Sequence, residues 1–355
     1  MYLTNRRKFI LYGCLTIGSG ILTACGNNNT STSSPSASPV ITPASNPSKL
    51  DKISFGTNWF AQAEHGGFYQ AIATGIYQEY GLDVIIKMGG PQINGTQLLM
   101  GGAIDFFMGH GADTLKALEA GIPKITVAAI FQKDPQILLA HPNPGLDSLA
   151  KLKGKPILVG SGANTTYWPV LKARYGFTDD QKRPYNFNVA PFLADPEAAQ
   201  QGYLTSEPLT VKKAGGFEPQ VFLLAESGYN PYATTIETKK ELVVKNPDLV
   251  QRFVDASIKG WYSYLKDPAP ANKLIKKDNP QMSDELLNYG LAQLKKYGII
   301  TSGDAETKGI GAMTDERWQS FAEEMVKVGL VKPGTNYRDA YTLKFINKGV
   351  SAYSS

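Results

Sequence analysis

A regular alternation of short apolar runs and amphipathic stretches begins at Lys52, and it constrains the fold more than any other feature of the chain. The apolar runs are predicted strands, at residues 52–56, 82–88, 103–109 and 124–132. The stretches between them are predicted helices that end in glycine, at residues 66–81, 91–102 and 111–121. Strands and helices that alternate at this spacing predict an α/β fold with a parallel or mixed sheet covered by helices.

A second unit of the same type follows. It contains a predicted helix and strand within residues 146–162, a helix at 164–177, a strand at 185–192 and two helices separated by a turn within 195–215. Residues 217–228 return toward the first unit, and three helices follow at 246–267, 283–298 and 314–329. Two crossings predict two lobes joined by a hinge, with lobe 1 formed by residues 51–141 and 224–355 and lobe 2 formed by residues 142–223.

The first 50 residues are predicted to be a targeting segment and a tether. Arg6, Arg7 and Lys8 precede an apolar stretch, residues 9–22, that is too short and too rich in glycine for a membrane span. Small residues then lead to Cys25, which predicts a lipoprotein signal peptide at residues 1–24 and a lipid on Cys25. An ordinary secretory signal is the alternative, and the export route, general secretory or twin-arginine, stays open. Residues 25–50 are rich in Ser, Pro, Asn and Thr and read as a flexible linker.

Charge and cysteine content exclude several classes of function. The chain has a formal net charge of +5, and without Arg6, Arg7 and Lys8 the charge is only +2, so a nucleic-acid partner is not expected. Cys14 and Cys25 are the two cysteines, and both are assigned to the targeting segment and its lipid. We therefore expect no disulfide, no catalytic thiol and no cysteine-based metal site.

Three strand-to-helix junctions are candidates for a ligand site, because ligands of open α/β sheets bind at the carboxyl ends of strands. They are residues 58–67 (NWFAQAEHGG), 108–114 (MGHGADT) and 160–168 (GSGANTTYW), and the turn at residues 202–208 (GYLTSEP) is a fourth candidate. Glycines there permit tight turns, and free N–H groups at a helix start bind polar or anionic groups. We expect these segments to meet in a cleft between the lobes.

The side chains at these segments suit a flat, polar molecule. Aromatic faces can stack on a ring, and carboxylates, amides and histidines can bind its edge. The predicted ligand-binding residues are Asn58, Trp59, Glu64, His65, Tyr69, Asn94, His110, Asp113, Phe131, Asn164, Thr165, Tyr167, Trp168, Tyr203 and Glu207. Asp113 and Thr165 can also be explained as helix caps, and Trp59 as a core residue.

Other chemistries find less support. The chain has no G-x-S-x-G, no phosphate-binding G-x-x-x-x-G-K-[ST] and no G-x-G-x-x-G after the first strand. A metal site could combine Glu64, His65 and His110 with His141, but their spacing matches no standard set of ligands. We expect neither a metal nor a resident cofactor. An exported enzyme that uses His65 or His110 as a base is the alternative from another class of function.

Four segments resemble the solute-binding proteins of ABC importers: residues 58–84, 102–123, 152–160 (LKGKPILVG) and 202–208. The resemblance is to the branch similar to the thiamine-pyrimidine precursor synthase, which also includes sulfonate, nitrate and riboflavin binders. It implies a two-lobed type II periplasmic-binding fold that closes on a small-molecule ligand and docks on a membrane permease driven by an ATPase. A lipid on Cys25 would keep the carrier, expected to be monomeric, near that permease at the membrane surface.

One departure separates this sequence from the synthase that it resembles. In the synthase a histidine at the position of His65 is consumed, a nearby lysine holds pyridoxal phosphate, and a Cys-rich motif precedes the later helices. Here the lysine position corresponds to Gly109, and SGYNPYAT at residues 227–234 replaces the Cys-rich motif. The resemblance therefore implies a binder and not an enzyme, with His65 as a ligand contact or a structural group.

The expected ligand is a small nitrogen heterocycle, such as a pyrimidine-type thiamine precursor or a related vitamin. The alternative is a small anion such as an alkylsulfonate, taurine or nitrate. Arginine is nearly absent from the junctions, which disfavours a purely anionic ligand. Whether the protein feeds a permease or acts as a sensor subunit stays open.

Overall fold

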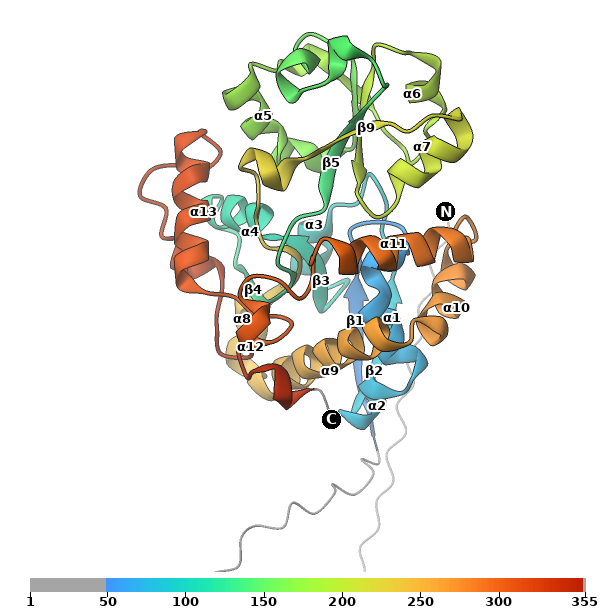
Figure 1. Ribbon diagram of the computed structural model, residues 1–355. Coiled ribbons are helices and arrows are strands. Elements are labelled where there is room, and N and C mark those ends of the chain that lie inside the picture. Colours follow the sequence, from blue (N-terminus) through green and yellow to red (C-terminus); the bar gives the residue numbers. More distant parts are fainter. Residues whose placement is uncertain (1–48, 354–355) are drawn as a thin grey trace, which may run out of the picture. The chain divides into compact units, whose positions relative to one another are not determined.

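The computed structural model describes residues 49–353, which contain two five-stranded sheets (Figure 1). The first sheet has the order β2-β1-β3-β10-β4. Its strands are β1 (Asp51–Gly56), β2 (Leu82–Lys87), β3 (Phe106–His110), β4 (Lys124–Phe131) and β10 (Ala233–Lys239). The second sheet has the order β7-β6-β8-β5-β9. Its strands are β5 (Gln136–Ala140), β6 (Ile157–Val159), β7 (Lys182–Pro184), β8 (Ala199–Tyr203) and β9 (Gln220–Leu223).

The two sheets share one topology. In each, a single strand runs antiparallel to its neighbours, β10 in the first sheet and β5 in the second. That strand is the first one that the chain forms after crossing from the other sheet. The sheets with their helices form two lobes, called here the first lobe and the second lobe, which confirms the predicted two-lobed α/β fold.

Helices flank both sheets. The first lobe contains α1 (Gly66–Ala73), α2 (Ile76–Glu79), α3 (Gly95–Met100), α4 (Gly111–Glu119), α8 (Lys240–Lys245), α9 (Pro247–Lys266), α10 (Ala269–Asp278), α11 (Asp284–Lys296), α12 (Ala305–Lys308) and α13 (Asp315–Lys327). The second lobe contains α5 (Trp168–Tyr175), α6 (Ala190–Ala194) and α7 (Glu207–Gly215). The three predicted C-terminal helices correspond to α9, α11 and α13, and Ser283 and Thr314 cap the last two with their side chains.

The glycine pair at the start of α1 allows close packing against α9. A Cβ atom at Gly66 would lie 2.2 Å from the ring of Tyr264, and one at Gly67 would lie 2.2 Å from the ring of Trp261. Both rings are fully buried. These glycines therefore explain helix packing in the first lobe, whereas the sequence had suggested that they serve a tight turn beside a ligand.

Two of the predicted helices were wrong. The helix predicted over residues 66–81 is broken between α1 and α2, because Gly75 adopts φ 79°, in the left-handed region. Residues within 195–205, predicted as a helix, contain the central strand β8, which pairs with β5 and β6. The Ala and Gln residues of β8 favour a helix in isolation, but pairing on both edges overrides that preference.

The predicted boundary between the lobes also needs correction. Residues 136–140 were assigned to lobe 1, but β5 pairs with β8 and β9 in the second sheet, and all five of its residues are buried. The chain therefore crosses between Phe131 and Gln136, before residue 141. The strand predicted at 185–192 is instead irregular chain leading into α6, and β10 was not predicted at all.

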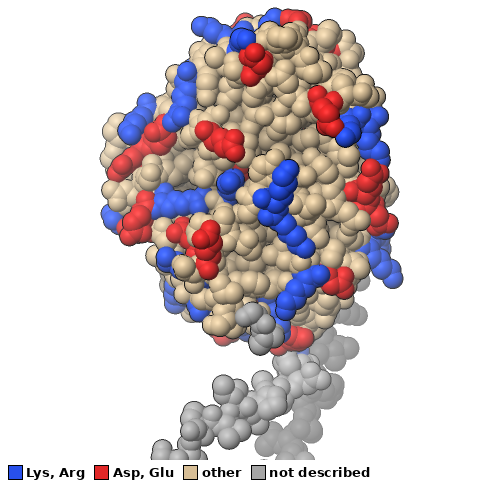
Figure 2. Space-filling model, in the orientation of Figure 1, with Lys and Arg blue, Asp and Glu red and all other residues tan. Residues whose placement is uncertain are grey.

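Charged side chains of both signs are interspersed on the face drawn in Figure 2. Among residues 49–353, no helix has the length and apolar character needed to cross a membrane. The predicted signal peptide, the lipid on Cys25 and the linker up to residue 48 lie outside the described residues.

Candidate ligand-binding site

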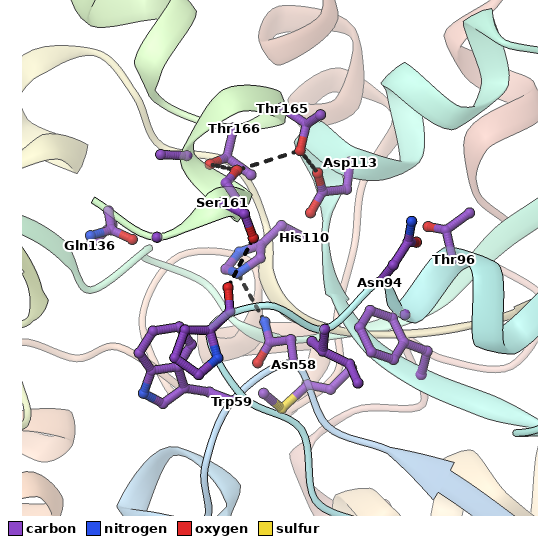
Figure 3. Close-up of a pocket in the computed structure, with 18 of the residues that line it drawn as sticks. Asn58, Trp59, Asn94, Thr96, His110, Asp113, Gln136, Ser161, Thr165 and Thr166 are labelled. Atoms are coloured by element: carbon purple, nitrogen blue, oxygen red, sulfur yellow. Dashed lines mark hydrogen bonds between the residues drawn. The ribbon is translucent and has the colours of Figure 1, made fainter. Parts of the chain in front are cut away.

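A cavity of about 590 Å³ is lined by segments of both lobes. The first lobe contributes the β1–α1 loop, the β2–α3 loop and the β3–α4 junction, and the second contributes the β6–α5 junction and the end of β8. All three predicted strand-to-helix junctions therefore meet at one cavity. In Figure 3, Asn58 and Trp59 face Ser161, Thr165 and Thr166, with His110 between the two groups.

His110 connects the two lobes at the centre of the cavity. Its Nε2 lies 3.2 Å from Nδ2 of Asn58 and 3.3 Å from the hydroxyl of Tyr203. If both groups donate to Nε2, the ring carries a proton on Nδ1. The Nδ1 atom is buried and has no partner among the described residues, so it can donate to a ligand acceptor.

Two buried glutamates lie in the cavity wall. Glu64 accepts a hydrogen bond from Thr205 of the second lobe through Oε1, while its Oε2 is buried and has no partner among the described residues. Burial raises the pKa of Glu64 to about 7. Glu207 accepts from Tyr185 at 2.8 Å and from the backbone N–H of Tyr203 at 2.8 Å, and burial raises its pKa above the ordinary value.

His65 is unsuited to act as a base near neutral pH. It is 1% exposed, and burial lowers its pKa to about 3. Its Nδ1 is buried and has no hydrogen-bond partner in the described part of the chain. The ring is therefore neutral, and it can serve as a packing surface or accept or donate one hydrogen bond to a ligand.

Hydrogen bonds across the cavity mouth join the lobes directly. The hydroxyl of Thr165 donates to Oδ1 of Asp113 at 2.7 Å, and the hydroxyl of Ser161 donates to the backbone carbonyl of Pro91 at 2.9 Å. Burial raises the pKa of Asp113, so the site holds a third carboxyl with a weakened tendency to ionise. These contacts correspond to a conformation in which the lobes are closed against each other at the mouth.

Aromatic rings of both lobes also line the cavity. Trp59 lies nearly parallel to Tyr185 of the second lobe, with ring centroids 6.3 Å apart and an interplanar angle of 19°. Tyr167 and Tyr203 line the cavity from the second lobe, and Tyr167 donates to Oε1 of Gln201 at 2.8 Å. Flat faces and carboxyl groups therefore occupy the same cavity, which is the combination that a planar polar ligand requires.

The structure brings together most of the predicted site residues. The cavity wall contains Asn58, Trp59, Glu64, His65, Asn94, His110, Asp113, Thr165, Tyr167, Tyr203 and Glu207.

The other four predicted residues lie elsewhere. Tyr69 is buried and donates to Asp278, and Phe131 packs against Trp261 in the core. Trp168 is buried and donates to Asp179 at 2.9 Å, and Asn164 accepts from Lys182 on the surface. Their positions next to the junctions could not reveal which way each side chain points.

Other cavity residues were not predicted. They include Gln62, Thr96, Phe107, Lys124, Gln136, Ser161, Thr166 and Gln201. Gln136 and Gln201 lie on β5 and β8, the strand that was missed and the strand that was taken for a helix, so no cleft position could be assigned to them. Lys124 begins β4, at the strand end opposite the expected ligand edge.

His141 does not join the other three candidate metal ligands in the cavity wall. The Nε2–H of His141 donates to the carbonyl of Phe192 at 2.8 Å, and its ring packs against the rings of Phe192 and Phe217, outside the cavity wall. Among residues 49–353, no group of three or more His, Cys, Asp and Glu side chains is placed to hold a metal ion.

The sequence matches one protein-family model and several proteins of known function. A family model described as NMT1/THI5 like matches residues 62–271. A riboflavin-binding protein, RibY of Chloroflexus aurantiacus, is 25% identical over 339 residues, which cover 93% of this chain and 95% of the relative. A formylaminopyrimidine-binding protein of Halalkalibacterium halodurans is 23% identical over 65% of this chain and 72% of its own length. A 4-amino-5-hydroxymethyl-2-methylpyrimidine phosphate synthase of Saccharomyces cerevisiae is 25% identical over 66% of this chain and 74% of its own.

Solved structures share the fold at lower sequence identity. The alkanesulfonate-binding protein SsuA of Xanthomonas axonopodis pv. citri matches 83% of this chain and 99% of its own, with a TM-score of 0.59 and 14% identity. The periplasmic nitrate-binding protein NrtA of Synechocystis PCC 6803 matches 83% of this chain and 87% of its own, with a TM-score of 0.54 and 14% identity. The two-lobed architecture is thus that of periplasmic binding proteins.

Proposed function

This chain belongs to the NMT1/THI5 like family, and from that premise we propose that it is the solute-binding component of an ABC importer for a small nitrogen heterocycle. The ligand is held between the two lobes and is delivered unchanged to a permease. The observation that carries the proposal is a cavity of about 590 Å³ that both lobes line with aromatic rings and buried carboxyl groups. Relatives that are named as riboflavin and formylaminopyrimidine binders support the same class of ligand.

The hydrogen-bonding groups favour a ring whose edge carries donors. Glu64 has a buried carboxylate oxygen without a protein partner in the described chain, and Asp113 and Glu207 add two further carboxyl groups to the wall. Amino and imino groups of a heterocycle donate to such oxygens. Because Glu64 has a pKa of about 7, its carboxyl can also be protonated and donate to a ring nitrogen at mildly acidic pH.

A small anion, the alternative ligand, fits the same wall poorly. Among the described residues that line the cavity none is arginine, and the two lysines, Lys116 and Lys124, are paired with Glu119 and Glu237. An alkylsulfonate or nitrate would therefore meet three carboxyl groups without an uncompensated cation. Although SsuA and NrtA share the fold, a fold alone does not determine the ligand.

The geometry also supports binding without a reaction. His65 is a weak base, with a pKa of about 3. A side chain at Gly109 would have its Cβ 2.2 Å from Oε1 of Glu237, so a lysine at this position would displace the buried Glu237 carboxylate. His110 contacts Asn58 and Tyr203, and within residues 49–353 it has no acidic partner in hydrogen-bond contact, so the alternative of an enzyme with a histidine base has no orienting group there to support it.

The proposal includes the setting in which the protein works. Cys25 would carry a lipid after removal of residues 1–24, and residues 25–50 would connect the two lobes to the outer side of the cytoplasmic membrane. The carrier would act there as a monomer beside its permease.

A thermal-shift screen tests the proposal. The panel contains riboflavin, an aminopyrimidine, thiamine, nucleobases, taurine, an alkylsulfonate, nitrate and divalent metal ions. A ligand at a hundredfold its Kd stabilises the protein by about 2.7 kcal/mol, which gives a clear shift. We expect a shift with a heterocycle that is lost in Trp59→Ala and retained in Trp318→Phe, a substitution of a buried tryptophan outside the cavity wall. A shift with sulfonate or nitrate alone would overturn the ligand class, and a shift with metal alone would overturn the site.

A further inference from the structure

The cavity extends well beyond the space that a single ring would occupy. Asp113 and Ala120 both line it, and they lie seven residues apart in and just after α4, so the cavity runs about 10 Å along that helix. One end of the cavity lies in the first lobe, between α3, α4 and the sheet, and it reaches solvent at Ala120, which is exposed. We call it the α3–α4 arm, and its wall consists of Thr96, Phe107, Ala117, Ala120, Ile122 and Lys124.

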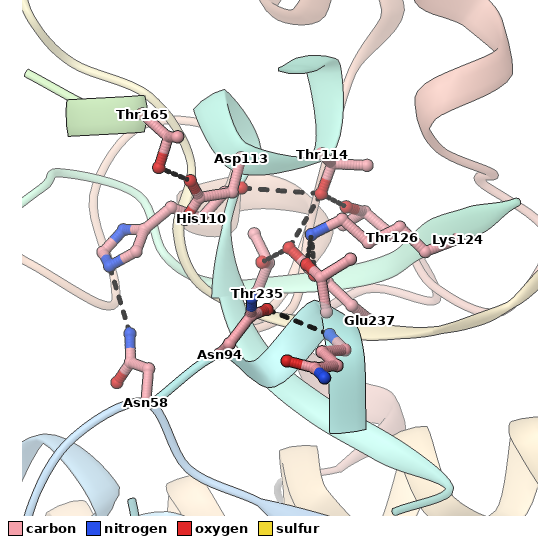
Figure 4. Close-up of polar contacts among 12 residues, drawn as sticks. Asn58, Asn94, His110, Asp113, Thr114, Lys124, Thr126, Thr165, Thr235 and Glu237 are labelled. Atoms are coloured by element: carbon pink, nitrogen blue, oxygen red, sulfur yellow. Dashed lines mark hydrogen bonds and ion pairs between the residues drawn. The ribbon is translucent and has the colours of Figure 1, made fainter. Parts of the chain in front are cut away.

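The base of the arm offers hydrogen-bond donors. Lys124 is 1% exposed, and its Nζ donates to Oε2 of Glu237 at 2.7 Å and to the hydroxyl oxygen of Thr96 at 3.2 Å. An ammonium group has three donors, so one N–H stays available to a ligand. The hydroxyl oxygen of Thr96 already accepts, so its own O–H can donate as well. Figure 4 shows the contact of Lys124 with Glu237.

The charge of Lys124 is compensated within the protein. Glu237 is fully buried, pairs with Lys124 and accepts further hydrogen bonds from Thr114 at 2.7 Å and Thr235 at 3.1 Å (Figure 4). The arm therefore presents donors without net positive charge. Such a surface suits neutral oxygen acceptors, whereas a phosphate group would need an uncompensated cation.

Apolar residues on three sides limit the width of the arm. Ala117 is buried on α4, and Ile122 precedes β4. The ring of Phe107 packs against the backbone of Gly95, where a Cβ atom would lie 1.9 Å from the ring. The arm thus combines an apolar side wall with a donor-rich base, which suits a chain of hydroxylated carbons better than a second flat ring.

We propose that the α3–α4 arm is a second subsite that holds a neutral, hydroxylated chain attached to the ring of the ligand. The proposal rests on the proposed function, since the ring is taken to occupy the mouth of the same cavity. It assigns the ligand to ring compounds that carry a polyol chain, and it makes Thr96 and Lys124 the residues that select for that chain.

Three compounds that share the isoalloxazine ring test the proposal: riboflavin, which carries a ribityl chain, lumiflavin, which carries a methyl group in its place, and riboflavin 5′-phosphate. Fluorescence titration of the purified protein should give a Kd for riboflavin at least tenfold below the Kd for lumiflavin, and the phosphate ester should bind more weakly than riboflavin. Ala117→Leu fills the arm and should abolish the preference for riboflavin while the Kd for lumiflavin stays unchanged. Thr96→Val should weaken riboflavin binding several-fold and leave lumiflavin unaffected.

The control is Ala173→Leu, the same substitution at an exposed position of α5, which should leave every Kd unchanged. Equal affinity for riboflavin and lumiflavin, tighter binding of the phosphate ester, or binding of an aminopyrimidine but not riboflavin would overturn the subsite and leave the proposed function intact. Failure of all these ring compounds to bind would overturn the proposed function together with the subsite.

Discussion

At the scale of single residues, Glu64 links the chemistry of the site to the stability of the fold. Its pKa is about 7 in the folded protein and 4.5 when unperturbed, so the unfolded chain releases this proton at lower pH. The wild type should therefore lose stability, relative to Glu64→Gln, as the pH rises from about 4.5 to about 7. One pKa unit corresponds to about 1.4 kcal/mol, so the difference in unfolding free energy should change by about 3 kcal/mol across this window.

Denaturant unfolding at a series of pH values measures this difference, with Glu306→Gln as a control that removes an exposed carboxylate. Above pH 7 both states of the wild type carry the charge, and the curves should run parallel. A difference between Glu64→Gln and wild type that stays constant from pH 4 to pH 8 would show that burial does not hold the proton on Glu64.

At the scale of elements, the close packing of α1 on α9 leaves no room for a side chain at Gly66 or Gly67. Gly67→Ala would place a Cβ atom 2.2 Å from the ring of Trp261, and overpacking of this kind costs about 1–3 kcal/mol. We expect a loss of that size in the unfolding free energy from chemical denaturation. Gly162→Ala is the matched control, because a Cβ there meets no atom within 4 Å. Equal stability of the two variants would contradict the role assigned to Gly67.

Many of the helices and strands could be predicted from the sequence, and others could not. Glycine stops and apolar spacing located β1 to β4 and the helices α4, α9, α11 and α13, because local signals and tertiary packing agree there. β8, within AAQQGY at 198–203, and β10, ATTIETK at 233–239, were missed because their sequences do not alternate between apolar and polar residues. Both strands pair with a neighbour on each edge, and strands in the interior of a sheet need no such alternation. The antiparallel strand of each sheet follows a crossing, so its partners lie far away in the sequence.

Part of the candidate site could be predicted from the order of strands and helices alone. The carboxyl ends of parallel strands share one edge, so Asn58, His110 and Thr165 could be placed together without knowledge of the packing. Tyr69 and Trp168 follow the same junctions but point into the core, because helix rotation and not chain position sets their direction. Lys124 reaches the cavity only through the arm, which no local pattern reveals.

At the scale of the whole molecule, hydrogen bonds across the mouth hold the lobes together. Thr165→Val removes the donor to Asp113 and should shift the population toward separated lobes, since such a bond contributes about 1 kcal/mol. Small-angle X-ray scattering of the ligand-free variant should show a larger radius of gyration than the wild type. Ligand binding should weaken about fivefold. Thr301→Val, at an exposed position, is the control, and identical scattering of all three proteins would contradict this role for Thr165.

The central claim concerns what the cavity selects, and a direct competition tests it. The purified protein is mixed with riboflavin, an aminopyrimidine, taurine, an alkylsulfonate and nitrate at equal concentrations, desalted and examined by native mass spectrometry. The aromatic rings and carboxyl groups of the cavity wall predict one ring compound bound per chain, released with its mass unchanged, and no ring compound bound to Trp59→Ala. A bound sulfonate or nitrate, a released compound of altered mass, or the absence of any bound compound would contradict the account.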